Sequence, residues 1–328
     1  MRILFITSTR IGDAVLSSGI LRHLIACYPD ARITVAVGRL SASLFEAVPG
    51  LERLIKIDKR PFEMHWLGLW RTVVSRRWDI VVDLRGSAIA YLLWTRRRHV
   101  IGSDARHRHH HRVEELAELL DARPPPSPTV WLTPRSEDAA ARLIPAGDPV
   151  LAVGPAANWP GKQWPAPRFA ELVQSLTAPG GILAGARLAV LAAAHEREQA
   201  QAVIEAVPAG RVIDLVGTVD LPTAAACLRR CALFIGNDSG LMHLAAAAGV
   251  PTLGLFGPTP ADRYGPWGAH AAFVRTQAPA AELMAKFRST PGAMGDLMTT
   301  LSVDSALGAA ESLWRRIASP APSGPTSG

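Results

Sequence analysis

Short runs of apolar, largely β-branched residues alternate along the first half of the chain with longer stretches whose apolar positions recur at helical spacing. The short runs predict buried strands and the longer stretches predict helices. The first helix is expected over residues 14–28, because Pro29 cannot continue it. The strands are expected at residues 2–6, 32–37, 53–57, 79–84 and 99–101.

The second half of the chain repeats this alternation. Strands are expected at residues 150–153, 187–191, 212–216, 233–235 and 252–256, with helices near 168, 196, 222 and 240. Pro-rich stretches at 123–134 and 145–149 interrupt the periodicity between the halves. We therefore expect one domain over 1–148, a second over 149–302, a closing helix at 303–318 and a disordered tail at 319–328.

Strands that alternate with helices predict parallel sheets. Open parallel sheets bind ligands at the carboxyl ends of their strands, where the strand-to-helix turns meet. Candidate functional residues are therefore sought in those turns.

The turn after the expected strand 233–235 reads Gly-Asn-Asp-Ser-Gly and leads into a helix of small residues. Asp238 and Ser239 can cap that helix, and Gly240 leaves its first turn open. Free N–H groups and the positive end of the helix dipole favour a diphosphate there. His243 lies one turn further on and is either a phosphate or ribose contact or a hydrogen-bonded core residue.

Two other turns of the second half carry charged candidates. Lys162 lies in the Gly/Pro-rich turn after the strand at 150–153, where its ammonium could neutralise a diphosphate or simply be solvated. Glu196 begins the helix after the strand at 187–191. Its carboxylate could accept hydrogen bonds from a ribose or cap the helix.

The first strand leads into a turn in which Gly12 permits close backbone approach and Asp13 opens a long helix. Asp13 has two interpretations that do not exclude each other. It can be the N-cap of the helix, or it can be a general base that takes a proton from an attacking hydroxyl.

The formal net charge of +7 indicates an anionic partner, such as a phosphorylated substrate, a membrane face or nucleic acid. Of the 35 basic residues 31 are arginine, which makes a lysine in a polar turn notable. The run 106–112, which contains His107 and Arg112, is either a solvated face or part of an anionic-acceptor patch with Arg85. Its adjacent histidines lack metal-ligand spacing, so no metal site is expected.

Cys27, Cys227 and Cys231 are too scattered for paired spacing and are expected to be buried thiols of a reducing compartment. The N-terminus shows no secretory signal and no apolar run approaches a membrane span. The expected location is the cytoplasm, either free or peripheral at the inner membrane, and no nucleic-acid partner is expected.

Four segments together resemble glycosyltransferase family 9, the ADP-heptose:lipopolysaccharide heptosyltransferases. They read RIGDAVL at 10–16, KQWP at 162–165, DSGLMHLAAA at 238–247 and FGPT at 256–259. The resemblance spans nearly the whole chain. It implies a GT-B fold, in which two Rossmann-like parallel-sheet domains face a central cleft.

The resemblance also implies function. It implies inverting, metal-independent transfer of a heptose from ADP-heptose to the inner core of lipopolysaccharide, without a cofactor and with a glycolipid acceptor at the cytoplasmic membrane face. Asp13 matches the base of the family, Lys162 the diphosphate contact and Glu196 the ribose contact. Asp238, Ser239, Gly240 and His243 match the pyrophosphate site, and Arg10, Arg85 and Arg112 are acceptor-side candidates.

Other functions stay open because the sequence departs from the family's pattern at some positions and because its fold class serves other functions. The turn before the lysine has Ala156, Ala157 and Asn158 where heptose-transferring members carry hydroxyl residues, and residues 271–296 lack the cysteines common in the family. Another donor, such as a UDP-sugar, is therefore the second interpretation. A nucleotide-binding dehydrogenase is a third, although no strand is followed by G-x-G-x-x-G, and an inactive binding module is a fourth.

Overall fold

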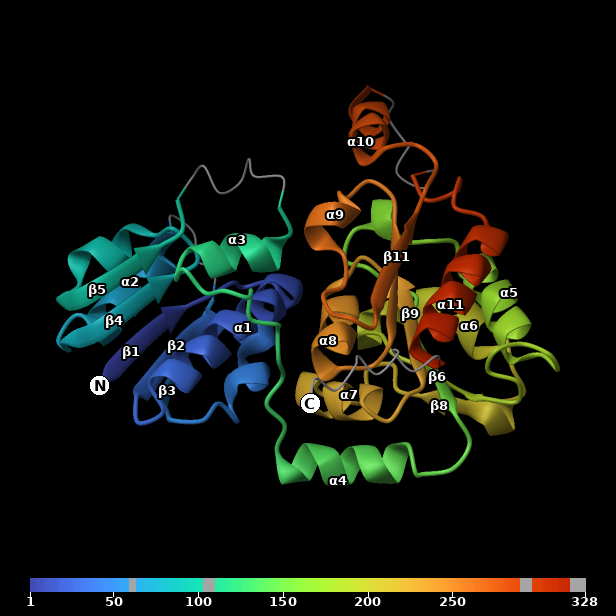
Figure 1. Ribbon diagram of the computed structural model, residues 1–328, viewed down its shortest axis with the longest axis horizontal. Coiled ribbons are helices and arrows are strands. Elements are labelled where there is room, and N and C mark those ends of the chain that lie inside the picture. The colour runs from blue at the N-terminus through green and yellow to red at the C-terminus, as the bar shows by residue number, and fades with distance from the viewer. Residues whose placement is uncertain (59–62, 103–109, 290–296, 319–328) are drawn as a thin grey trace, which may run out of the picture. The chain divides into compact units, whose positions relative to one another are not determined.

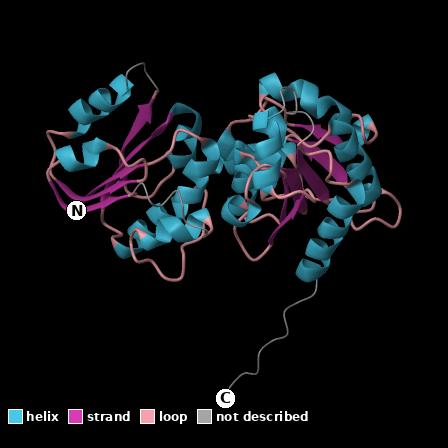
Figure 2. Ribbon diagram, turned by 90° about the horizontal axis from the view of Figure 1, so that it is seen from above, coloured by secondary structure: helices cyan, strands magenta, loops and turns pink. Residues whose placement is uncertain are grey.

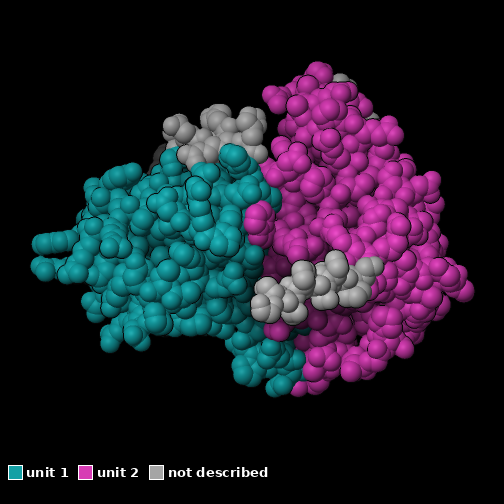
Figure 3. All heavy atoms as spheres, viewed as in Figure 1, with its two compact units in different colours: residues 1–139, 220–226 teal, residues 140–219, 227–328 magenta. Residues whose placement is uncertain are grey.

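The computed structural model describes residues 1–58, 63–102, 110–289 and 297–318. The chain forms two compact units, which have separate colours in Figure 3. The first contains residues 1–139 and 220–226, and the second contains residues 140–219 and 227–328. Each unit is a parallel sheet between helices (Figure 2). The domain limits expected from the sequence stay a prediction.

The first unit is built on a five-stranded parallel sheet with strand order β3-β2-β1-β4-β5 (Figure 1). The middle strand, β1, buries Ile3, Leu4, Phe5 and Ile6 completely, as expected of a strand covered on both faces. The strands are β1 (Arg2–Ile6), β2 (Arg32–Gly38), β3 (Leu51–Ile57), β4 (Trp78–Asp83) and β5 (Thr95–Val100).

Helices cover both faces of this sheet because the crossovers run in opposite directions from β1. The chain passes from β1 to β2 through α1 and returns from β3 to β4 through α2. Residues 14–21 of α1 are all buried, so this helix is enclosed on every side along its first half. The helical elements are α1 (Ile11–Cys27), η1 (Arg39–Phe45), α2 (Met64–Val73), η3 (Ala88–Leu92), α3 (Arg112–Glu118) and α4 (Pro134–Leu143), the last of which crosses the division between the units.

The second unit has a six-stranded parallel sheet with strand order β11-β10-β9-β6-β7-β8. Its strands are β6 (Val150–Gly154), β7 (Arg187–Val190), β8 (Val212–Asp214), β9 (Leu233–Asn237), β10 (Thr252–Phe256) and β11 (Ala271–Arg275). Its helical elements are η5 (Pro160–Lys162), α5 (Ala166–Thr177), η6 (Ala194–Glu196), α6 (Arg197–Ile204), η7 (Ala209–Arg211), α8 (Gly240–Ala248), α9 (Ala261–Tyr264), α10 (Ala280–Ser289) and α11 (Val303–Ala318). Helix α7 (Leu221–Leu228) is divided between the units.

Each sheet has one place where the strand order reverses, and there the turns after two neighbouring strands separate. In the first unit this place lies between β1 and β4, and in the second it lies between β6 and β9. Such a switch point is where open parallel sheets hold ligands. The turns that carry Asp13 and Lys162 follow β1 and β6, so both lie at switch points.

The structure confirms all ten expected strands and the closing helix, and it corrects three details. β5 begins four residues before the expected strand, and β11 was not expected at all. Cys227 and Cys231 are buried as expected, but Cys27 is exposed on the last turn of α1. The tail 319–328 lies outside the described residues. None of the helices described could cross a bilayer.

Candidate functional site

Lys162 and Asp238 meet at the switch point of the second sheet. Lys162 ends the short helix η5 after β6, and Asp238 follows β9 directly. The Lys162 Nζ donates to Asp238 Oδ2 at 2.6 Å, with the two side chains 24% and 7% exposed. The pair therefore holds a partly exposed ammonium beside the turn that opens α8.

Asn237 fixes the turn that carries the lysine. Its amide nitrogen donates to the Pro155 carbonyl at 2.7 Å, and its Oδ1 accepts from the Trp164 N–H at 3.0 Å. Asn237 itself is fully buried at the end of β9. One side chain of the central strand thus ties down both ends of the turn around Lys162.

A late segment of the chain also supports this turn. The Trp164 indole N–H donates to the Leu301 carbonyl at 2.9 Å, and the Arg168 guanidinium donates to the same carbonyl at 2.7 Å and to that of Thr299. Trp164 is almost fully buried and lies edge to face against Phe169. The turn is therefore anchored on both its β9 side and its C-terminal side.

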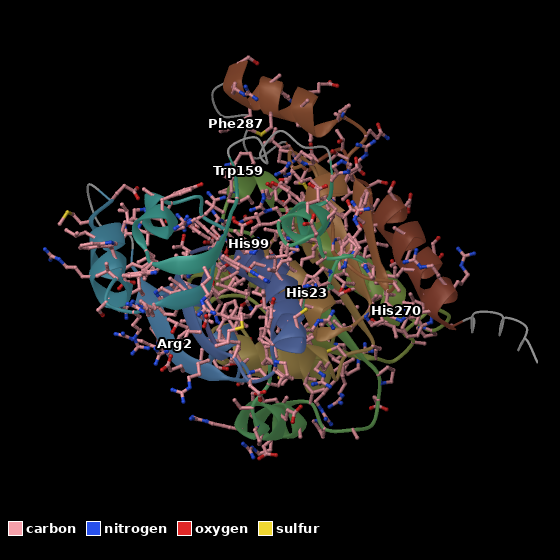
Figure 4. All side chains as sticks on the ribbon, turned by 60° about the vertical axis from the view of Figure 1, so that its left-hand side comes forward. Arg2, His23, His99, Trp159, His270 and Phe287 are labelled. Carbon is pink, nitrogen blue, oxygen red and sulfur yellow. The ribbon has the colours of Figure 1, made fainter. Side chains whose placement is uncertain are left out.

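The exposed end of the turn carries an aromatic pair. The Trp159 ring lies edge to face with Phe287 of α10, with centroids 5.3 Å apart (Figure 4). Gly161 leaves room for that ring, since a Cβ there would be 2.8 Å from Trp159 and 3.0 Å from Leu297. The pair links α10 to the turn at Trp159, three residues before Lys162.

Helix α8 opens toward the same turn. Ser239 is its N-cap and its Oγ accepts from the Met242 N–H at 3.4 Å, so Ser239 caps the helix while Asp238 is engaged by Lys162. Gly240 is the first helical residue and places no side chain over the helix start. His243 is buried one turn in, at 6% exposure. The open, glycine-led helix start and the positive end of the helix dipole suit an anion at this position.

Glu196 lies at the carboxyl end of β7, the strand next to β6. Its Oε2 accepts from the Ala193 N–H at 2.9 Å, which closes the short helix η6. The capping interpretation therefore accounts for one carboxylate oxygen. The other interpretation, a ribose contact, stays a prediction.

Asp13 lies in the first turn of α1, but it is not the N-cap. The cap position belongs to Arg10, whose side chain makes no capping bond. The N-cap interpretation of Asp13 is therefore wrong. The Ser8 Oγ donates to Asp13 Oδ2 at a long 3.4 Å, and the Arg10 N–H donates to Ser8 Oγ at 3.1 Å. The carboxylate of Asp13 remains partly accessible at the end of β1.

Gly38 supports the turn before Asp13 from the end of β2. Its N–H donates to the Ser8 carbonyl at 3.2 Å, and a Cβ there would lie 2.4 Å from the Thr9 Cα. Only glycine allows the two backbones to approach so closely. The position of the Asp13 turn thus depends on Gly38.

Asp83, at the end of β4, is a site residue that the sequence reasoning missed. It is fully buried and accepts from the Arg85 N–H at 2.8 Å, from the Ser87 N–H at 2.9 Å and from the Ser87 Oγ at 2.6 Å. Burial raises the pKa of this carboxyl, against the opposing effect of these hydrogen bonds and of Arg85. The available signal was an aspartate that ends an otherwise apolar strand.

Asp83 holds the loop that presents Arg85. The Arg85 Nη1 donates to Thr9 Oγ1 at 3.4 Å, and its guanidinium carbon lies 5.4 Å from the centre of the Trp66 ring. Arg85 therefore lies beside the turn that leads to Asp13. The structure brings these two predicted residues to the same end of the first sheet.

The third acceptor-side arginine is engaged elsewhere. Arg112 forms a 2.7 Å ion pair with Glu115, with side chains 16% and 1% exposed. His111 caps the same helix, α3, by accepting from the Val113 N–H at 3.1 Å. Residues 103–109 of the basic run lie outside the described part of the chain. Within that part, no group of three or more His, Cys, Asp or Glu side chains could hold a metal ion.

Comparison with known proteins identifies relatives along most of the chain. The model of glycosyltransferase family 9 (heptosyltransferase) matches residues 66–291. Lipopolysaccharide heptosyltransferase 2 of Salmonella typhimurium is 24% identical over 313 residues, covering 84% of this chain and 88% of that protein. Lipopolysaccharide heptosyltransferase 1 of Pseudomonas aeruginosa is 25% identical over 321 residues, covering 87% of each.

Solved structures share the architecture. The family 9 glycosyl transferase of Veillonella parvula has a TM-score of 0.80 at 22% identity and covers 96% of this chain and 97% of its own. E. coli ADP-heptose heptosyltransferase II has a TM-score of 0.74 at 20% identity, covering 97% and 100%. E. coli heptosyltransferase WaaC with ADP has a TM-score of 0.71 at 18% identity, covering 95% and 100%. The expected GT-B fold is confirmed.

Proposed function

The chain belongs to glycosyltransferase family 9, and on that premise we propose that it transfers a heptose from ADP-heptose to a sugar hydroxyl of the lipopolysaccharide inner core. Family membership makes the chain a glycosyltransferase and removes the dehydrogenase interpretation. Relatives matched over most of their length are lipopolysaccharide heptosyltransferases. A solved structure of similar fold contains ADP, which supports an adenine nucleotide as the donor's carrier.

The observation that carries the donor side of this proposal is the Lys162–Asp238 pair at the opening of α8. A diphosphate there would meet an ammonium and the positive end of a helix dipole together. Asp238 then serves to hold the lysine in place. Ser239, Gly240 and His243 complete the proposed pyrophosphate site, and Glu196 is the proposed ribose contact.

The reaction needs a base for the acceptor hydroxyl and positive charge for the departing nucleotide. We assign the base to Asp13, which takes the hydroxyl proton as the acceptor oxygen forms a bond to the anomeric carbon. The bond from that carbon to the diphosphate breaks, and its electron pair leaves with ADP. Attack opposite to the leaving group inverts the anomeric centre. Lys162 and the start of α8 stabilise the leaving charge in a metal-independent transfer.

The acceptor proposal rests on arginines of the first unit. Arg10 is exposed beside the Asp13 turn, and Arg85 lies against the same turn through Thr9. Arg112 is already paired with Glu115, so it contributes less to this proposal. An anionic glycolipid at the cytoplasmic face of the membrane is the acceptor that such a basic surface fits.

A nucleotide panel tests the donor assignment. We expect ADP at about 100 times its dissociation constant to stabilise the purified chain by about 2.7 kcal/mol, measured as a thermal shift. UDP, GDP and NAD at the same concentration should shift the melting temperature far less. Stabilisation by UDP in place of ADP would favour a UDP-sugar, consistent with the turn in which Ala156 and Ala157 replace hydroxyl residues. A response to NAD alone would refute the proposal.

Transfer itself is tested with ADP-heptose and a heptose-deficient glycolipid. Asp13→Ala should lower the rate of transfer by about 10²–10⁴-fold, the usual contribution of a general base, while leaving the ADP thermal shift intact. Near-normal transfer by Asp13→Ala would remove Asp13 from the base role. An absence of transfer by the wild type with intact ADP binding would indicate the inactive-module interpretation.

A further inference from the structure

Large apolar side chains are exposed together on one part of the first unit. They come from α2, from η3 and from the turn into β5, and they are 37–68% exposed. The five residues are Met64, Leu67, Tyr91, Leu92 and Trp94. We call them, with the arginines described next, the α2–η3 surface.

Helix α2 and η3 are neighbours because their inner sides share one core. Leu69 and Val73 of α2 belong to the same buried cluster as Ile89 and Ala90 of η3. The inner residues of α2 alternate at helical spacing with Met64, Leu67 and Arg71, which form its outer face. Helix α2 contacts η3 and β3, and η3 leads directly into β5, an edge strand of the same sheet.

Arginines accompany the apolar residues. The Arg77 guanidinium carbon lies 4.3 Å from the centre of the Trp94 ring, and that of Arg98 lies 5.3 Å from the centre of the Tyr91 ring. Residues 64–100 contain seven arginines and two aspartates, a net of +5 within a chain whose formal net charge is +7. One of the aspartates is the buried Asp83. Arg76 pairs with Glu52 and Arg97 donates to the Tyr28 hydroxyl. The positive charge at this surface therefore comes from Arg71, Arg77 and Arg98.

Two common explanations of exposed apolar residues and edge-strand arginines account for only part of the α2–η3 surface. Single exposed apolar residues are common on soluble proteins, but a contiguous group of them indicates an interaction site. Arg96, Arg97 and Arg98 could protect the edge strand β5 from pairing with another chain. That role does not account for the exposed Tyr91, Leu92 and Trp94 beside them.

Trp and Tyr side chains have an apolar body and a polar tip, and here arginine guanidinium groups lie over their rings. Such a combination suits the boundary between lipid headgroups and acyl chains. We propose that the α2–η3 surface binds an anionic phospholipid membrane. Leu92, Trp94 and Met64 enter the headgroup boundary, while Arg71 and Arg77 contact lipid phosphates. The proposal rests on the proposed function in one respect: membrane binding would bring the enzyme within reach of an acceptor that is embedded in the membrane.

The test is a vesicle flotation assay on the full chain. Vesicles of phosphatidylglycerol and phosphatidylethanolamine are compared with vesicles of phosphatidylcholine, at low and high salt. We expect binding to the anionic vesicles, weaker binding in high salt and little binding to the neutral ones.

Two variants separate the apolar from the ionic contribution. Tyr91→Ser/Leu92→Ser/Trp94→Ser and Arg71→Gln/Arg77→Gln should each weaken binding to the anionic vesicles by on the order of tenfold. Arg98 is left unchanged because it donates to the carbonyls of Ala90 and Leu93 and so holds η3.

Matched controls change equally exposed residues elsewhere. Leu40→Ser removes an apolar side chain that is 73% exposed on η1, and Arg135→Gln removes an exposed arginine on α4. Both should bind vesicles as the wild type does. An unchanged ADP thermal shift in every variant shows an intact fold and keeps this test separate from the donor assignment.

Three results would overturn the proposal. The wild type fails to bind anionic vesicles, the two surface variants bind as well as the wild type, or the controls lose binding equally. If vesicle binding is absent and the apolar variant instead converts a dimer into a monomer in analytical ultracentrifugation, the surface belongs to a second copy of the chain.

Discussion

Breaking the Lys162–Asp238 pair from either side should have unequal effects on stability. Lys162→Met leaves a carboxylate that is 7% exposed without its cation, whereas Asp238→Asn leaves a lysine that is 24% exposed and can turn toward water. Removing one partner from a fully buried pair costs about 3–5 kcal/mol. Because water partly screens this pair, we expect about 2–3 kcal/mol for Lys162→Met and about 1 kcal/mol for Asp238→Asn.

The double variant isolates the interaction. Once Asp238 is neutral, the loss of Lys162 no longer strands a charge, so Lys162→Met should cost under about 1 kcal/mol in the Asp238→Asn background. The free energies of unfolding come from urea titrations of the four proteins followed by tryptophan fluorescence. Equal costs of Lys162→Met in both backgrounds would refute the inference that the two groups are coupled.

The same variants also test the role of the Lys162–Asp238 pair in nucleotide binding. Loss of one charge-assisted contact to the diphosphate should weaken ADP binding by about 10–150-fold in Lys162→Met. Asp238→Asn keeps the Lys162 ammonium but no longer holds it in place, so a smaller loss of ADP affinity is expected. Isothermal titration calorimetry measures both. Unchanged ADP affinity in Lys162→Met would remove the lysine from the diphosphate site.

Three further predictions concern other parts of the chain. Because burial raises the pKa of Asp83, the stability that its protonated form contributes is present below the ordinary value of about 3.9 and is lost as the pH rises through the native pKa. The difference in unfolding free energy between wild type and Asp83→Asn should therefore fall with rising pH, and a difference that rises would contradict the assignment. Burial raises the pKa of Cys227 to about 11 and that of Cys231 to about 12, so a thiol reagent at pH 8 should modify one cysteine in the native chain, Cys27, and all three after denaturation. Gly38→Ala should destabilise the chain by about 1–3 kcal/mol and lower transfer without altering ADP affinity, because its Cβ would push the Thr9 backbone; transfer assays and calorimetry decide this.

Much of the fold could be predicted from the sequence because most strands are continuous apolar runs. β1 and β10 have the predicted bounds, since both are buried on both faces. β5 was underestimated because its first half is polar: it carries three arginines on an edge strand, where a polar pattern resembles a loop. β11 is an edge strand of the second sheet and buries little of its length, which weakens the apolar signal in the same way.

The turns that carry the site residues could be predicted from the sequence, but the contacts between those residues could not. Lys162 and Asp238 are 76 residues apart, and their pairing depends on the adjacency of β6 and β9, which no local pattern encodes. The capping role of Asp13 was mistaken because α1 begins three residues earlier than its apolar spacing indicates. Asp83 was overlooked because a carboxylate at a strand end has no distinctive spacing, and only its burial shows its importance.

The bonds from Trp164 and Arg168 to the carbonyls of Thr299 and Leu301 also bear on the order in which the protein matures during synthesis. Trp164 reaches a partner that the ribosome adds 137 residues later, and Arg168 reaches one added 131 residues later. Domains generally fold as they emerge, yet the turn around Lys162 cannot acquire both of its anchors until Leu301 has been made. A nascent chain would thus lack the finished turn around Lys162 for most of its translation.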